Sequence, residues 1–449
     1  MFNFNCMRLP FLMISIFILF FIFGCSTEES DSSAENNETA SNDEQSEDDV
    51  TKLTYWHNWE TGPGGEEIQQ SVAAFNKAHP NIEVEPVYVA ADGGDSVSSK
   101  LVTAVAGGNP PDVMLASRYG IAEYMDSLTL LNDLAERDGI DGDIYYDWAW
   151  GESTFEGDIL GLPYDGTSRA LYYNKDHFAE AGLDPEDPPT TIEELEDAAR
   201  QLTEQEDGRF NQFGLIPWLG EGWLYSWGWS FGGEFVDESN QVTANNPQVV
   251  EALEWMTGFA TELGAQNVLS FANSQGSNAQ DPFISEQVSM VVQGNWVMAQ
   301  IEEYNPDLNY GVSYIPTPTG DDFTTFLGGR ALIIPKGVEG DRLEAAWEFV
   351  KWLSSTEEGQ KHKEIKGEYS VLPEVNDELF GDIPNHQPFL DVLPNGRHRP
   401  VVLAGNMMWD ELAKAPDLVL DGQGTPQEIL DRVNETINNA IEQEEARRE

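Results

Sequence analysis

The feature that most restricts the fold of this chain is a regular alternation of strand and helix patterns that begins at Lys52. Apolar and polar residues alternate in the expected strand at 82–90, and apolar residues recur at helical spacing in the helix before it, as with Ile68, Val72 and Phe75. In chain order we expect a strand at 52–59, a helix at 64–79, a strand at 82–90, a helix at 96–106 and a strand at 110–117. This order predicts an α/β lobe built on a parallel sheet with right-handed crossovers.

Two later segments carry the signals that begin helices. Thr191 and Glu194 stand at capping-box spacing, and Thr425 and Glu428 repeat that spacing with a proline at the first helical position. A strand pattern over 287–296 breaks at Gly294. The alternation therefore continues almost to the C-terminus.

The N-terminus has a different character. The apolar run from Leu9 to Phe23 is 15 residues long, shorter than the ~20 residues that a membrane-spanning helix needs. It suits a secretory signal, and residues 22–25 resemble the lipobox of bacterial lipoproteins, which implies cleavage before Cys25 and lipidation of its sulfur. The alternative is an uncleaved anchor. We expect a signal peptide at 1–24 and attachment at Cys25, so that the protein is lipid-anchored outside the cytoplasm.

Residues 25–50 predict an acidic tether between this anchor and the folded part. Residues 26–49 contain ten acids and no base, and their apolar surface is too small to offset the entropy of ordering. The mature chain of 449 − 24 = 425 residues is too long for one ordinary core and suggests two or three domains.

The charge balance excludes some partners. From residue 50 onward there are 80 − 10 = 70 acids and 23 − 1 = 22 bases, a net charge of −48. Such a chain is a poor ligand for nucleic acid or for an anionic membrane surface. The pattern is typical of a solvated acidic surface in a protein exposed to high salt, where added NaCl should raise stability by screening repulsion.

The sequence contains none of the local motifs of common catalytic sites. There is no P-loop, dinucleotide fingerprint, nucleophile elbow or zinc helix, so we expect no cofactor, no metal and no enzyme. Residues 138–143 are acidic but lack EF-hand spacing, and an acidic turn is the simpler interpretation. A glycosidase with two distant carboxylates stays open.

Tryptophan occurs where a buried core does not require it. Trp255, Trp347 and Trp352 lie on helix faces and are expected in the core. Others stand at expected loops or element ends: Trp56 and Trp59, then Trp218 and Trp223 in a glycine-rich stretch, then Trp296 and Trp409. Aromatic walls with a few polar groups are typical of ligand sites, and they suit sugar rings.

Several segments together resemble the carbohydrate group of extracellular solute-binding proteins of ABC importers, which includes maltose-binding protein. They are PPDVML at 110–115, LPYDGTSRALYYNKDHFAEAGL at 162–183, ISEQVSMVVQGNW at 284–296 and YGVSYIPTPTGDDFTTFLGGRALIIPKG at 310–337. The resemblance covers residues 52–440. It implies a two-lobed, periplasmic-binding-protein-like α/β fold of class II type, with a ligand cleft between lobes that a hinge joins.

The resemblance also implies lobe limits and site residues. Lobe one would comprise 51–165 and 328–370, and lobe two 166–327 and 371–449. The implied sugar platforms are Trp296 and Trp409, and the implied cleft-lining positions are Asp165, Gly328 and Gly329. The further candidate ligand-binding residues are Trp56, Asn58, Trp218 and Trp223. Ala116 stands where maltose-binding protein has an aromatic residue, which argues against maltodextrin.

The expected partners are a carbohydrate, the permease subunits of an ABC importer, and the membrane through the lipid anchor, with the protein itself a monomer. Two alternatives remain open at this point: an exported lipoprotein enzyme acting on polysaccharide, and a binding protein for a non-sugar solute such as a polyamine.

Overall fold

The computed structural model describes residues 50–91, 98–207 and 209–448. The predictions for the signal peptide, Cys25 and most of the tether lie outside these residues. Within the described part, no helix has both the length and the apolar character that crossing a bilayer requires.

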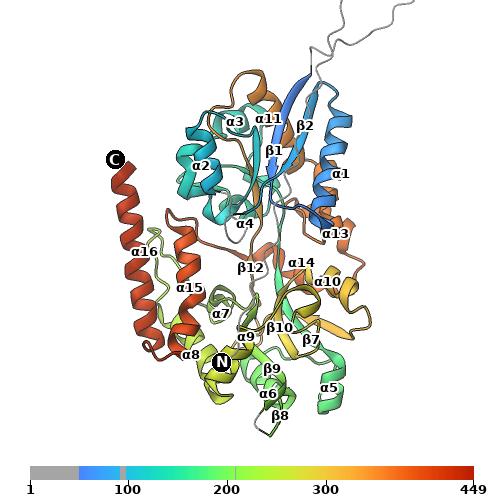
Figure 1. The fold of residues 1–449 in the computed structure, drawn as a ribbon, viewed down its shortest axis with the longest axis vertical. Helices are drawn as coiled ribbons and strands as arrows, with labels where there is room; N and C mark the ends of the chain where they lie inside the picture. The colour runs from blue at the N-terminus through green and yellow to red at the C-terminus, as the bar shows by residue number, and fades with distance from the viewer. Residues whose placement is uncertain (1–49, 92–97, 208, 449) are drawn as a thin grey trace, which may run out of the picture. The chain divides into compact units, whose positions relative to one another are not determined.

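The first sheet has five strands in the order β2-β1-β3-β13-β6. Strands β1 and β2 lie side by side in this sheet (Figure 1). Their bounds are β1 Thr51–His57, β2 Ile82–Tyr88, β3 Val113–Ser117, β6 Leu162–Pro163 and β13 Arg330–Ile333. β1 runs parallel to β2 and β3, as predicted, but β13 is antiparallel to both of its neighbours. The predicted parallel arrangement is therefore confirmed for β1, β2 and β3, whereas β13 enters the sheet in the opposite direction because it belongs to a segment that returns from the other lobe.

Both faces of this sheet are buried, which explains why residues 113–116 of β3 are all apolar. Val113 and Leu115 pack into a core with helices α1 (Gly62–Ala78) and α11 (Asp341–Ser355). Met114 and Ala116 point the other way, toward α2 (Ser98–Ala106) and the 3₁₀ segment η2 (Arg118–Ser127). Alternate residues of a strand face opposite sides, so a strand covered on both sides must be apolar at every position.

The second sheet has the order β11-β7-β10-β9-β8, with bounds β7 Arg169–Asn174, β8 Glu204–Glu206, β9 Arg209–Gly220, β10 Val288–Gly294 and β11 Tyr310–Ser313. Only β9 and β10 are parallel. The helices packed on one face are α6 Ile192–Leu202, α7 Leu224–Ser230, α8 Pro247–Glu262, α15 Gly405–Leu420 and α16 Pro426–Arg448. Those on the other are α9 Ala265–Ala272, α10 Val297–Tyr304, α13 Pro373–Phe380 and α14 Gln387–Val392.

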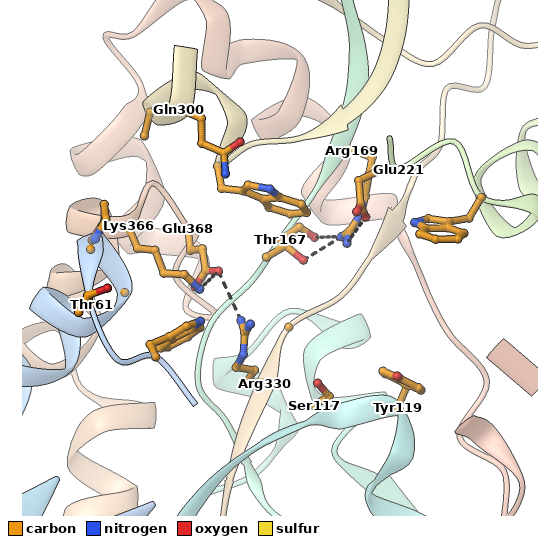
Figure 2. Close-up of a pocket in the computed structure, with 18 of the residues that line it drawn as sticks. Thr61, Ser117, Tyr119, Thr167, Arg169, Glu221, Gln300, Arg330, Lys366 and Glu368 are labelled. Atoms are coloured by element: carbon orange, nitrogen blue, oxygen red, sulfur yellow. Dashed lines mark hydrogen bonds and ion pairs between the residues drawn. The ribbon is translucent and has the colours of Figure 1, made fainter. Parts of the chain in front are cut away.

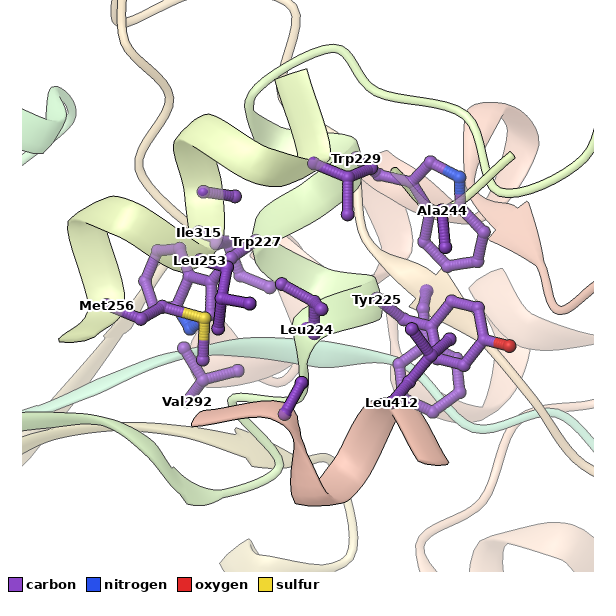
Figure 3. Close-up of a cluster of buried hydrophobic side chains, with 14 of the residues drawn as sticks. Leu224, Tyr225, Trp227, Trp229, Ala244, Leu253, Met256, Val292, Ile315 and Leu412 are labelled. Carbon is purple, nitrogen blue, oxygen red and sulfur yellow. The ribbon is translucent and has the colours of Figure 1, made fainter. Parts of the chain in front are cut away.

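The core on the α7–α8 side contains several of the tryptophans in the glycine-rich stretch (Figure 3). Trp227 is fully buried and donates its indole N–H to the carbonyl of Pro217 at 2.8 Å. Trp218 lies near the end of β9, as expected of an element-end position, but it packs against the cores on both faces of the sheet. The strand continues through Pro217 and Trp218 up to Gly220.

Both predicted capping boxes are confirmed. The Thr191 hydroxyl accepts the backbone N–H of Glu194, whose carboxylate accepts the N–H of Thr191. At α16 the same exchange joins Thr425 and Glu428. These contacts satisfy N–H groups that helix starts leave without partners.

The chain crosses between the sheets in three segments that are hydrogen-bonded to one another. Residues 164–168 connect β6 to β7, and Gly166 exchanges backbone hydrogen bonds with Tyr369 at 2.7 and 2.8 Å. Thr167 pairs in the same way with Gly328 at 3.0 and 3.1 Å. All strands of each sheet fall within the segments predicted for one lobe, while the boundaries themselves stay a prediction.

Candidate ligand-binding cleft

A cavity of about 990 Å³ opens among residues of both sheets and of the crossing segments (Figure 2). Its aromatic lining consists of Trp59, Tyr119, Trp223, Trp296, Tyr304 and Trp409. Its charged lining consists of Arg169, Glu221, Glu303, Arg330, Lys366, Glu368 and Arg399. Its size is that of a small-molecule site.

The ends of secondary-structure elements place most of these side chains. In the first lobe, Trp59 follows β1 by two residues and Tyr119 lies just after β3. In the second lobe, Trp223 and Trp296 occupy the positions that cap α7 and α10, and Trp409 lies in the second turn of α15. Side chains at element ends can turn toward a cleft because only one side is packed.

Trp409 is the centre of an aromatic cluster on one wall. Its ring centroid lies 4.9 Å from that of Trp223, 5.8 Å from Tyr119 and 5.9 Å from Tyr225. Tyr119 comes from the first lobe, so the two lobes meet at this wall. The indole nitrogen of Trp223 is buried and has no hydrogen-bond partner within the described part of the chain.

The ring of Trp296 packs directly against Gly294. A Cβ atom at Gly294 would lie 2.2 Å from the six-membered ring of Trp296, so only glycine lets the indole take this position. The guanidinium carbon of Arg169 lies 5.2 Å from the Trp296 ring centre and 3.7 Å from that of Phe326. Stacking of this kind stabilises a cation over an aromatic face.

The positive charge of Arg169 is balanced by the carboxylate of Glu221. Its Nε and Nη2 donate to Glu221 at 3.1 and 3.0 Å, and its Nη1 donates to the Thr167 hydroxyl at 2.8 Å. Burial lowers the pKa of Arg169 to about 10, against the opposing effect of Glu221. Figure 2 shows this pair on one side of the cavity and Lys366, Glu368 and Arg330 on the other.

The second charged group contains two cations and two acids. Arg330 contacts Asp165 and Glu368, each at 3.4 Å, and Lys366 also pairs with Glu368. Burial, followed by the charge of Asp165, raises the pKa of Glu368 to about 8. Burial alone would raise the pKa of Asp165, but the Arg330 charge and a hydrogen bond from Glu368 hold it well below its usual range. Glu368 is therefore the group here that titrates near neutral pH.

Trp59 is covered by these cations. The Nζ of Lys366 lies 3.3 Å from its ring centre and the guanidinium carbon of Arg330 lies at 4.1 Å. Trp59 therefore contacts protein cations as well as lining the cavity.

The structure brings four of the predicted site residues together at this cavity: Trp223, Trp296, Gly329 and Trp409. Gly328 adjoins the lining, and Asp165 lies fully buried behind it, where it accepts the backbone N–H of Arg330 at 2.7 Å. Trp56 packs against the α2 side of the first sheet, and neither it nor Asn58 or Trp218 is among the lining residues. Their roles in ligand binding stay predictions.

Sequence reasoning missed the charged lining. One usable signal was present, since residues 396–400 read GRHRP in a chain with only 23 Lys and Arg residues. Among the described residues, no group of three or more His, Cys, Asp or Glu side chains is arranged to hold a metal ion.

Comparison with known proteins gives one consistent result. The family described as bacterial extracellular solute-binding protein matches residues 58–360. The sn-glycerol-3-phosphate-binding periplasmic protein UgpB of Salmonella typhimurium is 25% identical over 332 residues, which cover 69% of this chain and 71% of that protein.

Solved structures agree. The protein CpMnBP1 with mannotriose bound has a TM-score of 0.75 at 28% identity, covering 86% of this chain and 99% of that one. An ABC transporter solute-binding protein of Thermotoga lettingae, bound with α-D-tagatose, has a TM-score of 0.71 at 25% identity, covering 87% and 100%. These similarities confirm the predicted two-lobed, periplasmic-binding-protein-like fold, and this chain belongs to the bacterial extracellular solute-binding protein family.

Proposed function

We propose that the protein captures a carbohydrate in the cleft between its lobes and delivers it to the permease of an ABC importer. The observation that carries this proposal is the cavity wall, where Trp223, Trp296 and Trp409 stand beside polar side chains. Aromatic faces pack on the C–H faces of sugar rings, and polar neighbours bind the hydroxyls. The sugar-bound proteins with the same fold support this choice.

Hinge closure would couple capture to delivery. The crossing segments at 164–168, 328–329 and 367–370 form a narrow hydrogen-bonded connection between the sheets. Rotation about a few such residues can open and close a cleft without repacking either core.

Calorimetric titration with a panel of neutral and acidic saccharides tests the proposal. A ligand that binds only the folded protein must also raise its melting temperature. If no saccharide binds, or if a polyamine binds in its place, the carbohydrate proposal fails. Turnover of a glycoside would favour the enzymatic alternative, although the family and the similar structures are binding proteins.

We also propose that lipid on Cys25 anchors the protein to the extracytoplasmic side of the membrane. The position of Cys25 directly after the apolar run supports this. Replacement of Cys25 by Ser should release the protein from the membrane fraction and remove the diacylglyceryl mass. Membrane retention of the Cys25→Ser protein with no change in lipid mass would contradict this.

A further inference from the structure

The cleft concentrates positive charge in a strongly acidic protein. From residue 50 onward acids outnumber bases 70 to 22, yet the lining contains four bases and three acids. One of the acids, Glu303, is exposed on α10. This excess of cations is unlike the rest of the body, and the pairing of each cation shows where it becomes available to a ligand.

Two of the charged groups are internally balanced. Arg169 is matched by Glu221, with all three of its guanidinium nitrogens engaged. Arg330 and Lys366 are matched by Asp165 and Glu368. The first group has no net charge, and in the second each cation already contacts a carboxyl group, although Glu368, whose pKa is raised to about 8, ionises fully only above neutral pH.

The third group is not balanced. Glu152 accepts the Nε of Arg118 at 3.0 Å on one oxygen and the Nε of Arg399 at 3.1 Å on the other. Arg118 and Glu152 are fully buried and Arg399 is 8% exposed. One carboxylate therefore serves two guanidinium groups, which leaves a surplus positive charge beneath the cleft. An uncompensated buried charge is costly.

Both guanidinium groups have nitrogens to spare. Nη2 of Arg118 is buried and has no hydrogen-bond partner among the described residues. For Arg399, which lines the cavity, the described part of the chain provides a hydrogen bond to Nε but none to Nη1 or Nη2. The free edge of Arg399 is held in place by stacking, since its guanidinium carbon lies 4.0 Å from the ring centre of Tyr119 and 5.4 Å from that of Trp409.

Gly328 and Gly329 in the crossing segment leave space for these two guanidinium groups. A Cβ on Gly328 would lie 2.9 Å from Nη2 of Arg399, and a Cβ on Gly329 would lie 2.7 Å from Nη2 of Arg118. Gly329 also has a φ of +147°, which side chains other than glycine rarely adopt. Any other residue at these positions would occupy the space in front of the guanidinium groups.

We propose, resting on the proposed carbohydrate function, that the ligand is an acidic saccharide whose oxyanion, a carboxylate or a phosphate, binds the free edge of Arg399. A guanidinium fork matches the paired oxygens of an oxyanion, and the ligand's negative charge offsets the surplus that Glu152 leaves. Trp409, beside Arg399, can then hold the sugar ring. A neutral hydroxyl would accept a hydrogen bond here but would leave the charge uncompensated.

Calorimetry with matched probes tests this: glucose against glucuronate, glucose against glucose 6-phosphate, and glycerol against sn-glycerol 3-phosphate. In the unaltered protein we expect the charged member of a pair to bind about 10- to 100-fold tighter, the range of a hydrogen bond to a charged group. The stronger of the carboxylate and phosphate arms identifies the source of the oxyanion.

Arg399→Gln should abolish this preference, because the affinity for the charged probe falls to that for its neutral partner. Arg397→Gln is the matched control, because Arg397 is exposed and pairs with Glu234 away from the cleft lining. Melting curves show whether each variant folds. If Arg399→Gln does not fold, Arg399→Lys keeps the charge without the fork and should lower the preference partially.

The outcomes separate the two proposals. Equal or tighter binding of neutral saccharides overturns the oxyanion site and leaves the carbohydrate function standing, as does a preference for the charged probe that survives in Arg399→Gln. Binding of sn-glycerol 3-phosphate with no saccharide bound retains the oxyanion site and overturns the carbohydrate function. Binding of none of these probes overturns the acidic-saccharide proposal.

Discussion

The same residue type performs two tasks in this molecule, and the difference lies in how each indole is partnered. Trp227 and Trp347 are 0% and 1% exposed, and each donates its N–H to a protein acceptor at 2.8 Å. At the cleft, Trp296 and Trp409 are only partly buried, and Trp223 leaves its buried N–H without a partner in the described chain. The indole N–H groups of Trp227 and Trp347 are thus satisfied within the core, whereas each of these cleft tryptophans retains a face or a donor that a ligand can use.

The largest effect should come from breaking the core member of this comparison. Trp347→Ala removes a buried indole from the core between α1, α11 and the first sheet. We expect a loss of ~3–5 kcal/mol in the free energy of unfolding, with ligand affinity unchanged in the fraction that folds. Denaturant unfolding measures the first quantity and calorimetry the second. A stable variant with weakened binding would contradict the assignment of Trp347 to the core.

Truncation at the cleft should show the reverse pattern. Trp296→Ala and Trp409→Ala each remove an aromatic platform from the cavity wall, so affinity should fall by ~1–3 kcal/mol, or about 5- to 150-fold. Stability should fall by less than in Trp347→Ala, because both side chains are partly exposed. Normal binding by both folded variants would move the platform to other members of the wall.

The charged group of Arg330, Lys366 and Glu368 in the cleft lining should make the stability of the protein depend on pH, which the apolar cores cannot do. Glu368 has a folded-state pKa raised to about 8, above the ~4.3 of an unfolded chain. Between these values the folded protein binds more protons than the unfolded one, so this contribution to stability is complete below pH ~4.3 and is lost as pH rises through about 8. Glu368→Gln stays neutral and lacks the contribution.

We therefore expect the free energy of unfolding of the unaltered protein, relative to that of Glu368→Gln, to fall by roughly 3 kcal/mol from pH 5 to pH 8. Denaturant unfolding at several pH values measures it. Taking the difference removes the contribution of several histidines with lowered pKa values, which are present in both proteins. Parallel stability curves for the two proteins would contradict the assignment.

Local signals in the sequence predicted a large part of the fold, because the interactions they report are local. Both capping boxes depend on residues three positions apart, and the burial of β3 follows from an apolar pattern within five residues. Antiparallel β13 could not be predicted in this way, since its direction depends on how the chain re-enters the first sheet after passing through residues 166–327 of the other lobe.

The candidate site was predicted only where its residues stand in recognisable segments. Trp296 follows a strand that ends in glycine, and Gly329 belongs to the glycine pair before β13. The group of Arg118, Glu152 and Arg399 was not predicted because its members are distant in sequence. Glu152 lies 34 positions from Arg118 and 247 from Arg399. With 80 acids in the chain, no single carboxylate stands out until the structure shows its partners.

The smallest expected effect tests the support of the cleft tryptophan without removing it. The three atoms nearest to a Cβ at Gly294 would all belong to the indole of Trp296, two of them at 2.2 Å. In Gly294→Ala the ring should therefore move while the backbone of β10 stays in place. We expect affinity to fall by roughly 1 kcal/mol, about fivefold, less than in Trp296→Ala.

Gly258→Ala is the matched control, because Gly258 lies in α8 with nothing within 4 Å of a Cβ. Alanine there should stabilise the helix by ~0.5–1 kcal/mol without changing affinity. If Gly294→Ala binds like the unaltered protein, the position of the Trp296 ring does not contribute to binding, and the contrast between cleft and core tryptophans would then rest on Trp409 and Trp223 alone.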